Sequence, residues 1–505
     1  LKMQDRIYDC IVIGGGISGL RTATLLKEKD LDVCVLEARD RVGGRTHSVV
    51  VDGYRWDVGG QWVGPTQRRV LDLVKESGQK TFPQQQNGKK VLEIDGKCSR
   101  YSGTIPPLNI FGMIETNITL WRLERLCQTI NVEAPYLSPN AAQLDSITVQ
   151  QWIDRNVYSK ITKKLIHIAL IAVFSADPAE ISLLFALFYF KSAGGVMPCL
   201  EVEKGAQQDR ILGSAHQLSL TMNERLGNQV VHLEHEVQSI DHKDEVIIIT
   251  CNNNKRFYAR RVVVTVPPIL ATRIQYSPAL PTPRQHLTQR MPMGQVIKFV
   301  IFYDTCFWRD LGFAGEIVSD RESICVCYDG SFEDGSRASI VGFFEGNSAR
   351  EWADRPQEDR RKEVIDLLHK SFGDDRALQP TRYIDQNWMA ERYSLGGYGS
   401  LCPPGVITSV GNALRQPVDK IHFAGSETGM QWAGYMEGAL QSAERVSDEV
   451  VQALKGKNAK SSSKPYQYMD TKLARSNKSV TSGSSMVLLS CTLVVFVSML
   501  VLLIK

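Results

Sequence analysis

The stretch that decides the fold is Tyr8-Asp9-Cys10-Ile11-Val12-Ile13-Gly14-Gly15-Gly16-Ile17-Ser18-Gly19. An apolar run meets a glycine turn, and an apolar-periodic segment from Leu20 to Leu26 follows. This order predicts a strand, a tight turn and a helix, as in a dinucleotide-binding βαβ unit. Gly14 permits the turn, Gly16 lets a pyrophosphate approach the backbone, and Gly19 allows close packing of helix on strand. The N–H groups at the start of the helix attract the phosphate charge.

A second predicted strand, from Asp32 to Leu36, ends in Glu37, where an acidic side chain accepts hydrogen bonds from an adenosine ribose. Beyond it, Arg39-Asp40-Arg41-Val42-Gly43-Gly44-Arg45 places a second glycine pair between arginines. Guanidinium forks pair bidentately with phosphate oxygens, so this segment suits the second side of a pyrophosphate. The alternative is a structural glycine turn in another βαβ unit.

These two motifs resemble those of the FAD-binding oxidases and desaturases of the glutathione reductase-like superfamily. Two further runs, Trp56 to Gln67 and Phe423 to Thr428, narrow the resemblance to the flavin amine oxidases, and within them to the monoamine oxidase branch. The resemblance covers about Tyr8 to about Val451. It implies FAD as cofactor, with contacts from Gly14, Gly16, Ser18, Gly19, Glu37, Arg39, Gly44, Arg45, Gly59, Gly60, Gln61, Trp62, Val237, Trp388, Gly425, Ser426 and Met436.

Length and composition set limits on the function. The chain has 505 residues, enough for two or three domains, and a net charge of +4 without a basic, aromatic-rich stripe, which argues against nucleic-acid binding. The 11 cysteines are scattered and contain no CxxC, which indicates free thiols in a reducing compartment. The chain starts at Leu1 without a visible signal peptide, so an upstream targeting segment stays open.

The predicted fold class is α/β: a Rossmann-like, glutathione reductase-like FAD domain interrupted by an inserted α+β substrate domain, followed by a C-terminal transmembrane helix. Helical spacing of apolar residues predicts helices over 147–171 and 181–190, with a break at 175–178. The aromatics Phe185, Phe188, Tyr189 and Phe190 are expected in the core rather than in a pocket. We assign 5–80, 211–286 and 393–454 to the FAD domain, 81–210 and 287–392 to the substrate domain, 455–485 to a polar linker and 486–504 to a membrane anchor.

Histidines and a serine suggest two other chemistries. His232, His235 and His242 invite a metal site, but residues three apart in an extended strand face opposite sides, so we expect no metal. The sequence Gly16-Ile17-Ser18-Gly19 is a near miss to the GxSxG motif and belongs to the phosphate turn. A serine hydrolase therefore has no support.

The resemblance also implies which residues carry the chemistry. In the family two tyrosines form a cage for the amine in front of the flavin, and they match Tyr398 and Tyr435. Lys298 lies in the apolar run Val296 to Phe302 and matches a lysine that holds a water at the flavin; the alternative places it on the solvent face of an edge strand. Gln207 matches a polar residue of the substrate cavity.

One position departs from the family pattern. Monoamine oxidases link FAD to a cysteine within Ser-Gly-Gly-Cys-Tyr, and this chain has Gly397 at that place. Cys402 lies five residues on, before Pro403-Pro404, and would be displaced from the flavin. We therefore predict non-covalent FAD, in a relative of monoamine oxidase or in another flavin amine oxidase such as a polyamine oxidase.

The tail differs in composition. Residues 455–485 are rich in Lys and Ser, and Met486 to Ile504 contains no charged residue, which is enough for about 28 Å of helix. The segment predicts a bilayer-spanning tail anchor with the bulk of the protein facing the cytosol. The resemblance points to the mitochondrial outer membrane. The sequence leaves the oligomeric state open between a monomer and a homodimer.

The predicted function is FAD-dependent oxidative deamination of a small-molecule amine, with oxygen as acceptor and a carbonyl product and hydrogen peroxide as products. Two alternatives share the glycine motifs: a polyamine oxidase-type flavoenzyme and an FAD-dependent desaturase acting on a lipid-soluble substrate. The desaturase has no evident use for Lys298 or the two tyrosines. A flavoprotein without catalytic activity is the remaining class.

Overall fold

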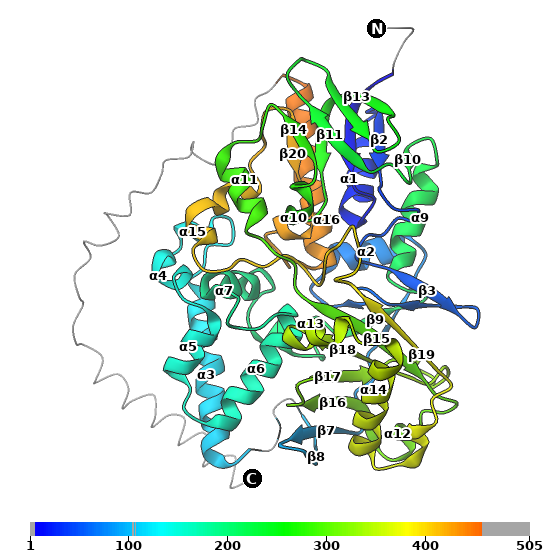
Figure 1. The fold of residues 1–505 in the computed structure, drawn as a ribbon, viewed down its shortest axis with the longest axis vertical. Coiled ribbons are helices and arrows are strands. Elements are labelled where there is room, and N and C mark those ends of the chain that lie inside the picture. Colours follow the sequence, from blue (N-terminus) through cyan, green and yellow to red (C-terminus); the bar gives the residue numbers. More distant parts are fainter. Residues whose placement is uncertain (1–5, 104–105, 107, 457–505) are drawn as a thin grey trace, which may run out of the picture. The chain divides into compact units, whose positions relative to one another are not determined.

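The computed structural model describes residues 6–103, 106 and 108–456. The chain divides into two units, residues 1–463 and 464–505, and the second lies outside the described residues. The described part contains sheets of eight, seven, three and two strands. The two larger sheets position the site (Figure 1).

The eight-stranded sheet is organised around β1 (Ile7–Ile13), which runs parallel to β2 (Val33–Leu36) on one side and β13 (Arg256–Val264) on the other. Both faces of the sheet are buried at β1, one under helices and the other against further apolar residues. A strand buried on both faces needs apolar side chains at almost every position, and β1 has them. The other strands are β10 (Val231–His232), β11 (Val237–Asp241), β12 (Ile247–Cys251), β14 (Gln275–Ser277) and β20 (Ile421–Phe423).

Three helices cover this sheet, and they come from distant parts of the chain. They are α1 (Ile17–Lys27), α9 (His216–Leu226) and α16 (Met436–Leu454), drawn in blue, green and orange in Figure 1. The sheet therefore collects strands from the three segments assigned to the FAD domain, 5–80, 211–286 and 393–454. The domain boundaries themselves stay a prediction.

The seven-stranded sheet is organised around β15 (Val296–Phe302), in which every residue is buried. It lies between β19 (Arg382–Asn387) and β18 (Ser339–Glu345), and is antiparallel to both. The placement of Lys298 on a solvent-facing edge strand is therefore wrong. The sheet continues with β17 (Val326–Asp329), β16 (Phe313–Ser319), β7 (Lys89–Ile94) and β8 (Lys97–Tyr101).

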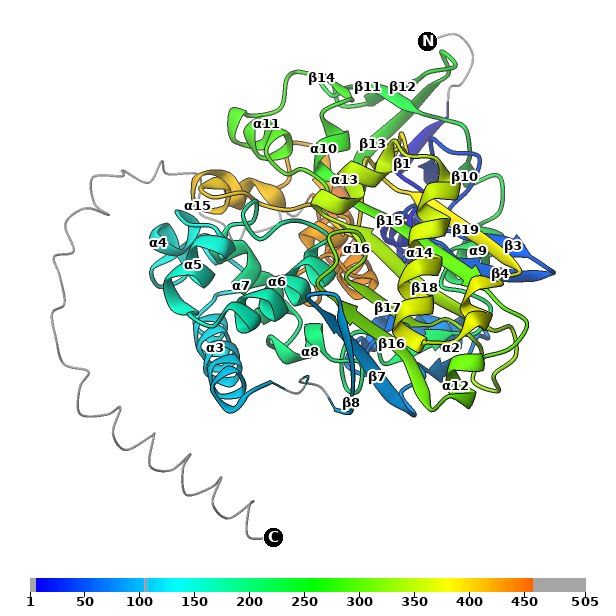
Figure 2. The ribbon, with the colours of Figure 1, turned by 60° about the horizontal axis from the view of Figure 1, so that its bottom comes forward.

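Side chains of β15 alternate between two environments. Ile297, Phe299 and Ile301 pack in one core cluster with apolar residues of α14 (Gln357–Phe372), the helix that lies across this sheet in Figure 2. Val296 and Lys298 point to the other face, where both line the cavity described below.

The helical region differs from the prediction at one point. The stretch over 147–171 forms two helices, α5 (Val149–Asn156) and α6 (Lys160–Phe174). Val157 is extended, the Ser159 hydroxyl caps α6, and the N–H groups of Tyr158 and Ser159 donate to Glu115 at 2.7 and 2.8 Å. Apolar periodicity continues through this break because both helices face the same core.

The remaining elements complete the described chain. They are β3 (Ser48–Val51), β4 (Tyr54–Asp57), β5 (Trp62–Val63), β6 (Thr81–Pro83), β9 (Asp209–Ile211), α2 (Arg68–Glu76), α3 (Ile110–Gln128), α4 (Ala141–Asp145), α7 (Leu183–Ser192), α8 (Met197–Leu200), α10 (Pro268–Ala271), α11 (Thr282–Gln289), α12 (Phe307–Asp310), α13 (Asn347–Ala353), α15 (Val406–Val410) and the short 3₁₀ helices η1 (Pro135–Leu137), η2 (Asp375–Leu378), η3 (Gly411–Leu414) and η4 (Ser426–Thr428).

The membrane anchor over 486–504, and the linker from residue 457 onward, lie outside the described residues. Within residues 6–103, 106 and 108–456, no helix has the length and apolar character needed to cross a bilayer.

Candidate active site

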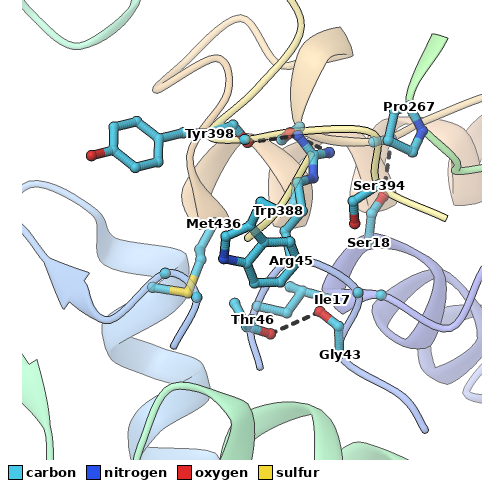
Figure 3. Close-up of a pocket in the computed structure, with 18 of the residues that line it drawn as sticks. Ile17, Ser18, Gly43, Arg45, Thr46, Pro267, Trp388, Ser394, Tyr398 and Met436 are labelled. Carbon is cyan, nitrogen blue, oxygen red and sulfur yellow. Dashed lines mark hydrogen bonds between the residues drawn. The ribbon is translucent and has the colours of Figure 1, made fainter. Parts of the chain in front are cut away.

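A cavity of about 300 Å³ is lined by residues from both large sheets. All but one of the residues that the sequence nominated for cofactor, catalysis or substrate line it, and Figure 3 shows several of them. The nominated lining residues are Gly14, Gly16, Ser18, Glu37, Arg39, Gly44, Arg45, Gly59, Gly60, Gln61, Trp62, Gln207, Val237, Lys298, Trp388, Tyr398, Gly425, Ser426, Tyr435 and Met436. Segments more than 400 residues apart therefore meet at one site.

Gly19 is the nominated residue that does not line the cavity, and its role is packing. A Cβ atom there would lie 1.9 Å from the Gly14 carbonyl oxygen, so α1 approaches the turn as closely as only glycine allows. Gly14 has a φ of +107°, which favours glycine. Around Gly16, in contrast, a Cβ atom would meet nothing within 4 Å. The turn thus leaves open space above the backbone at Gly16.

The start of α1 suits an anion. Its N-cap residue, Gly16, makes no side-chain capping bond, and its first turn contains no acidic residue. The N–H groups of that turn are therefore free to donate hydrogen bonds to a ligand. The helix dipole favours negative charge at the same place. Together with the space at Gly16, these features fit the pyrophosphate of a dinucleotide.

Glu37 is held by the main chain. Its Oε2 accepts from the Gly15 N–H at 2.6 Å and its Oε1 from the Arg39 N–H at 2.9 Å. An ionised carboxylate can accept about four hydrogen bonds, so both oxygens keep capacity for ribose hydroxyls. The carboxylate lines the cavity, although it is only 4% exposed.

The two arginines are already paired with carboxylates of the protein. The Arg39 guanidinium donates to Glu391 at 3.2 Å, and Arg45 donates to both oxygens of Glu427 at 2.6 and 3.0 Å. Burial alone would raise the pKa of Glu427, but the charge and hydrogen bonds of Arg45 hold it below its usual value. The guanidinium groups that we expected to face a pyrophosphate therefore bond these carboxylates of the protein. Both arginines nevertheless line the cavity.

Lys298 is 2% exposed, on the interior strand β15 next to the edge strand β19 of the seven-stranded sheet. Its Nζ donates to the Gly59 carbonyl at 2.8 Å and to Gln61 Oε1 at 2.6 Å. An ammonium group has three N–H donors, so one stays available on the cavity side. Burial lowers the pKa of Lys298, and the nearby buried Asp57 opposes this with its negative charge.

Tyr398 and Tyr435 both supply aromatic surface to the cavity. Tyr398 packs edge-on against Phe343 with ring centroids 5.9 Å apart, and its hydroxyl donates to Glu345 at 2.7 Å. Its carbonyl accepts from Arg45 at 3.0 Å, as drawn in Figure 3. The Tyr435 ring lies 5.5 Å from that of Tyr189 and 4.9 Å from that of Trp432.

Two other nominated residues have distinct environments. The indole Nε1–H of Trp388 donates to the Val58 carbonyl at 2.8 Å, which fixes the ring against the cavity wall. The buried Oε1 of Gln207 has no hydrogen-bond partner in the described part of the chain. An amide oxygen without a partner at a cavity wall suits contact with a ligand.

Sequence reasoning missed part of the cavity wall. Tyr189 was assigned to the core with Phe185, Phe188 and Phe190; all four are buried, but Tyr189 also lines the cavity. Other lining residues that sequence reasoning missed are Ala172, Val173, Val326, Tyr328 and Phe343. Apolar residues in regular strands and helices carry no local signal that separates a cavity wall from a core.

No cysteine of the described residues lines the cavity. Cys402 is buried in the helical core, where its carbonyl accepts from the Ser182 N–H at 2.9 Å. Gly397 does line the cavity, and a Cβ atom there would lie 3.0 Å from Val296 Cγ1.

The histidine geometry differs from the expectation. The rings of His232 and His235 have centroids 5.6 Å apart, so they do not face opposite sides. The reason is that β10 ends at His232 and Glu234 adopts a φ of +59°, which turns the chain. In the part of the chain that the structure describes, no group of three or more His, Cys, Asp or Glu residues could hold a metal ion.

Comparisons with known proteins identify the family of this chain. The profile of the family described as flavin containing amine oxidoreductase matches residues 17–451. A probable flavin-containing monoamine oxidase A of Dictyostelium discoideum is 39% identical over 451 residues, covering 88% of this chain and 98% of that protein. The flavin-containing amine oxidase A of Equus caballus is 38% identical over 458 residues, covering 90% and 86%.

Solved structures show the same relationship. Cyclohexylamine oxidase from Brevibacterium oxydans superposes with a TM-score of 0.85 at 31% identity, covering 89% of this chain and 100% of that one. Putrescine oxidase bound to putrescine gives a TM-score of 0.85 at 29% identity, covering 88% and 99%. The chain therefore belongs to the flavin-containing amine oxidoreductases and is an FAD-dependent enzyme that oxidatively deaminates amines.

Proposed function

We propose that Lys298, Tyr398 and Tyr435 carry the reaction at one end of the cavity, while the β1–α1 turn and Glu37 hold FAD at the other. The observation that supports this most is that these residues, drawn from distant segments, line one continuous cavity. FAD held there would supply the acceptor for a hydride equivalent from the carbon next to the amine nitrogen and the route of the electrons to oxygen, with hydrogen peroxide as product.

The tyrosines would orient the amine. Only the neutral amine has a lone pair to assist oxidation, and aromatic faces hold it without engaging that lone pair in a hydrogen bond. Tyr435→Leu removes one face, and we expect kcat/KM to fall roughly tenfold to a hundredfold with flavin still bound. Tyr435→Phe, which keeps the face, is the matched control. Equal losses in both variants, measured by peroxide release, would contradict the cage.

The wall near the tyrosines favours an amine with an apolar substituent. Ala172, Val173, Val326 and Phe343 line it, and the carboxylates that do line the cavity, Glu37 and Glu236, come from the eight-stranded-sheet side. A diamine or polyamine needs an anionic partner for its second cation, and none of the carboxylates that line the cavity in the described residues lies on this wall. A peroxide assay against alkyl and aryl monoamines, diamines and polyamines tests this. Higher kcat/KM for a polyamine than for every monoamine would refute it.

FAD is proposed to be held without a covalent bond, because Gly397 has no sulfur and the described cysteines lie away from the cavity. Many preorganised polar contacts can give tight binding without a bond. Denaturation in acid followed by filtration should release yellow FAD, and the intact mass should equal that of the bare polypeptide. Flavin that stays with the denatured chain would point to a cysteine linkage.

For residues 486–504 we propose a tail anchor in the mitochondrial outer membrane, from the length of the uncharged run and the family resemblance. Truncation before Met486 should release an active flavoprotein from membranes. A truncated protein that still pellets after a carbonate wash contradicts the anchor, and imaging of the tagged full-length chain tests the compartment. Light scattering of the detergent-solubilised enzyme distinguishes a monomer from a homodimer.

A further inference from the structure

Glu345 is a buried acid next to the proposed cage. It is the last residue of β18, lies opposite Val296 of β15 and is 3% exposed. Side chains two apart in a strand share a face, so Glu345 points to the same side as Phe343, a residue of the cavity wall. Its Oε1 accepts the hydroxyl hydrogen of Tyr398 at 2.7 Å. Tyr398 thus stands between the carboxyl group and the cavity.

The other carboxyl oxygen, Oε2, is buried and has no hydrogen-bond partner in the described part of the chain. No lysine or arginine among the described residues pairs with Glu345. On the elements packed against it, the Lys298 ammonium bonds Gly59 and Gln61, and Arg350 of α13 bonds Glu180 at 2.7 Å. The titratable groups whose pKa values Glu345 affects are weak acids: Tyr398, Tyr328, Cys325 and Cys327.

An uncompensated carboxylate in a dry site is costly, and burial raises the pKa of Glu345 to about 8. A positive charge in the cavity would offset that cost, since charges interact more strongly in a low-dielectric site than in water. Amines are mostly cations in water near neutral pH, because alkylammonium groups lose their proton near pH 10. The Glu345 carboxylate lacks a positively charged partner among the described residues, and the protonated amine substrate carries a charge of that sign.

We propose that Glu345 is a specificity-determining positioning residue, which acts through Tyr398 to favour cationic ligands in the cage. Its carboxylate fixes the Tyr398 ring by the hydroxyl hydrogen bond and makes the electrostatic potential at the ring more negative, which strengthens cation–π attraction. The inference rests on the proposed place of Tyr398 at the amine site. It concerns binding of the cation, before any oxidation.

The test compares two non-oxidisable probes of the same shape on the FAD-loaded enzyme. Choline carries a permanent positive charge, and 3,3-dimethylbutan-1-ol replaces its nitrogen by carbon. Neither probe titrates between pH 6 and 10, so a change in inhibition constant reports the protein. We expect choline to bind roughly threefold to tenfold more tightly as pH rises through the Glu345 transition, while the neutral alcohol changes little.

Two variants assign the transition. Glu345→Gln keeps an acceptor for the Tyr398 hydroxyl but cannot ionise, so the pH dependence of choline binding should vanish. Lys298→Met removes the other buried group that titrates near neutrality, and the pH dependence should persist. If Glu345→Gln fails to fold, the wild type and Lys298→Met still test the proposal, because choline binding must depend on pH in both.

Opposite outcomes overturn the inference. These are a transition that survives in Glu345→Gln, one that disappears in Lys298→Met, or no difference between choline and the alcohol in the wild type. If neither probe competes with the amine substrate, the proposed amine site itself is wrong. Competition by both probes without a pH effect rejects only Glu345.

Discussion

At the end of the cavity formed by β1 and α1, polarity comes from the main chain: uncapped N–H groups follow Gly16, and two N–H groups hold Glu37. At the end formed by β15 and β18, polarity comes from two buried side chains, Lys298 and Glu345. Main-chain dipoles do not titrate, whereas both side chains have pKa values moved toward neutrality. We therefore expect pH to act on the amine and oxygen chemistry more than on the hold on FAD.

We expect the largest effect at Gly16, where a substitution should reduce flavin binding without affecting the packing of the backbone. Gly16→Val places its side chain where a Cβ meets nothing within 4 Å and where φ is −76°, so the apo protein should fold normally. The added methyl groups would occupy the space for pyrophosphate, and flavin content should fall more than about tenfold. Absorbance at flavin wavelengths and the melting temperature of the apo protein measure the two effects.

Gly14→Val is the contrasting variant. Its Cβ would lie 2.6 Å from Thr265 Oγ1 at a φ of +107°, so it should lower the stability of the apo protein as well as flavin binding. If Gly16→Val destabilises the apo protein as much as Gly14→Val does, the space at Gly16 is needed for folding rather than for the cofactor.

The next effect concerns Lys298 and oxygen. Lys298→Met keeps most of the side-chain volume and removes the free N–H donor, so reoxidation should slow by roughly tenfold or more while reduction by the amine changes less. Rapid mixing of the two half-reactions measures both rates. An unchanged rate with oxygen would exclude Lys298 from this step.

The pH dependence of reoxidation has a definite sign. Burial lowers the pKa of Lys298 to about 7, so the ammonium form is lost as pH rises through that value. If the cation assists oxygen reduction, the wild-type rate falls over the same range and Lys298→Met is flat. Because the Asp57 charge raises the Lys298 pKa, Asp57→Asn should move the fall to lower pH. A shift to higher pH would contradict this coupling.

Glu345 should make stability depend on pH. Its pKa is raised from 4.5 to about 8 in the folded state, so between these values the folded protein holds a proton that the unfolded chain has lost. The free energy of unfolding therefore falls as pH rises from about 4.5 to about 8, by on the order of 5 kcal/mol at most. Glu345→Gln should lack this fall, and denaturant titrations at pH 5, 7 and 9 would show it. Parallel curves for both proteins would argue that Glu345 stays ionised throughout.

The smallest change is at Gly397. A Cβ atom there lies 3.0 Å from Val296 Cγ1, so Gly397→Cys alone crowds the wall, and Val296→Ala relieves the crowding. We expect the double variant to retain flavin after denaturation, since the sulfur then stands where the family carries its linkage. Val296→Ala alone is the control and should release FAD like the wild type. Complete release from the double variant would show that the local backbone does not present a thiol to the flavin.

The nucleotide end could be predicted because Gly14, Gly16 and Glu37 lie within one short stretch whose spacing is itself the signal. The amine end is assembled from distant strands and helices, so Phe343 and Tyr328 could not be told from core residues. Family resemblance supplied Lys298 and Tyr398, but Glu345 has no motif and becomes visible only through its contact with Tyr398. The pairing of Arg45 with Glu427 likewise joins residues 382 positions apart.

The placement of the thiols bears on how this enzyme survives its own product. Hydrogen peroxide forms in a cavity that no described cysteine lines, and peroxide oxidises thiolates rather than thiols. Burial raises the pKa of Cys127, Cys199 and Cys325 to about 12, so these groups stay protonated and inert. Peroxide leaving the cavity would first meet a solvent-accessible thiol at Cys98, on the surface strand β8. Among the described cysteines, oxidation should therefore begin at the exterior of the protein rather than at the cavity.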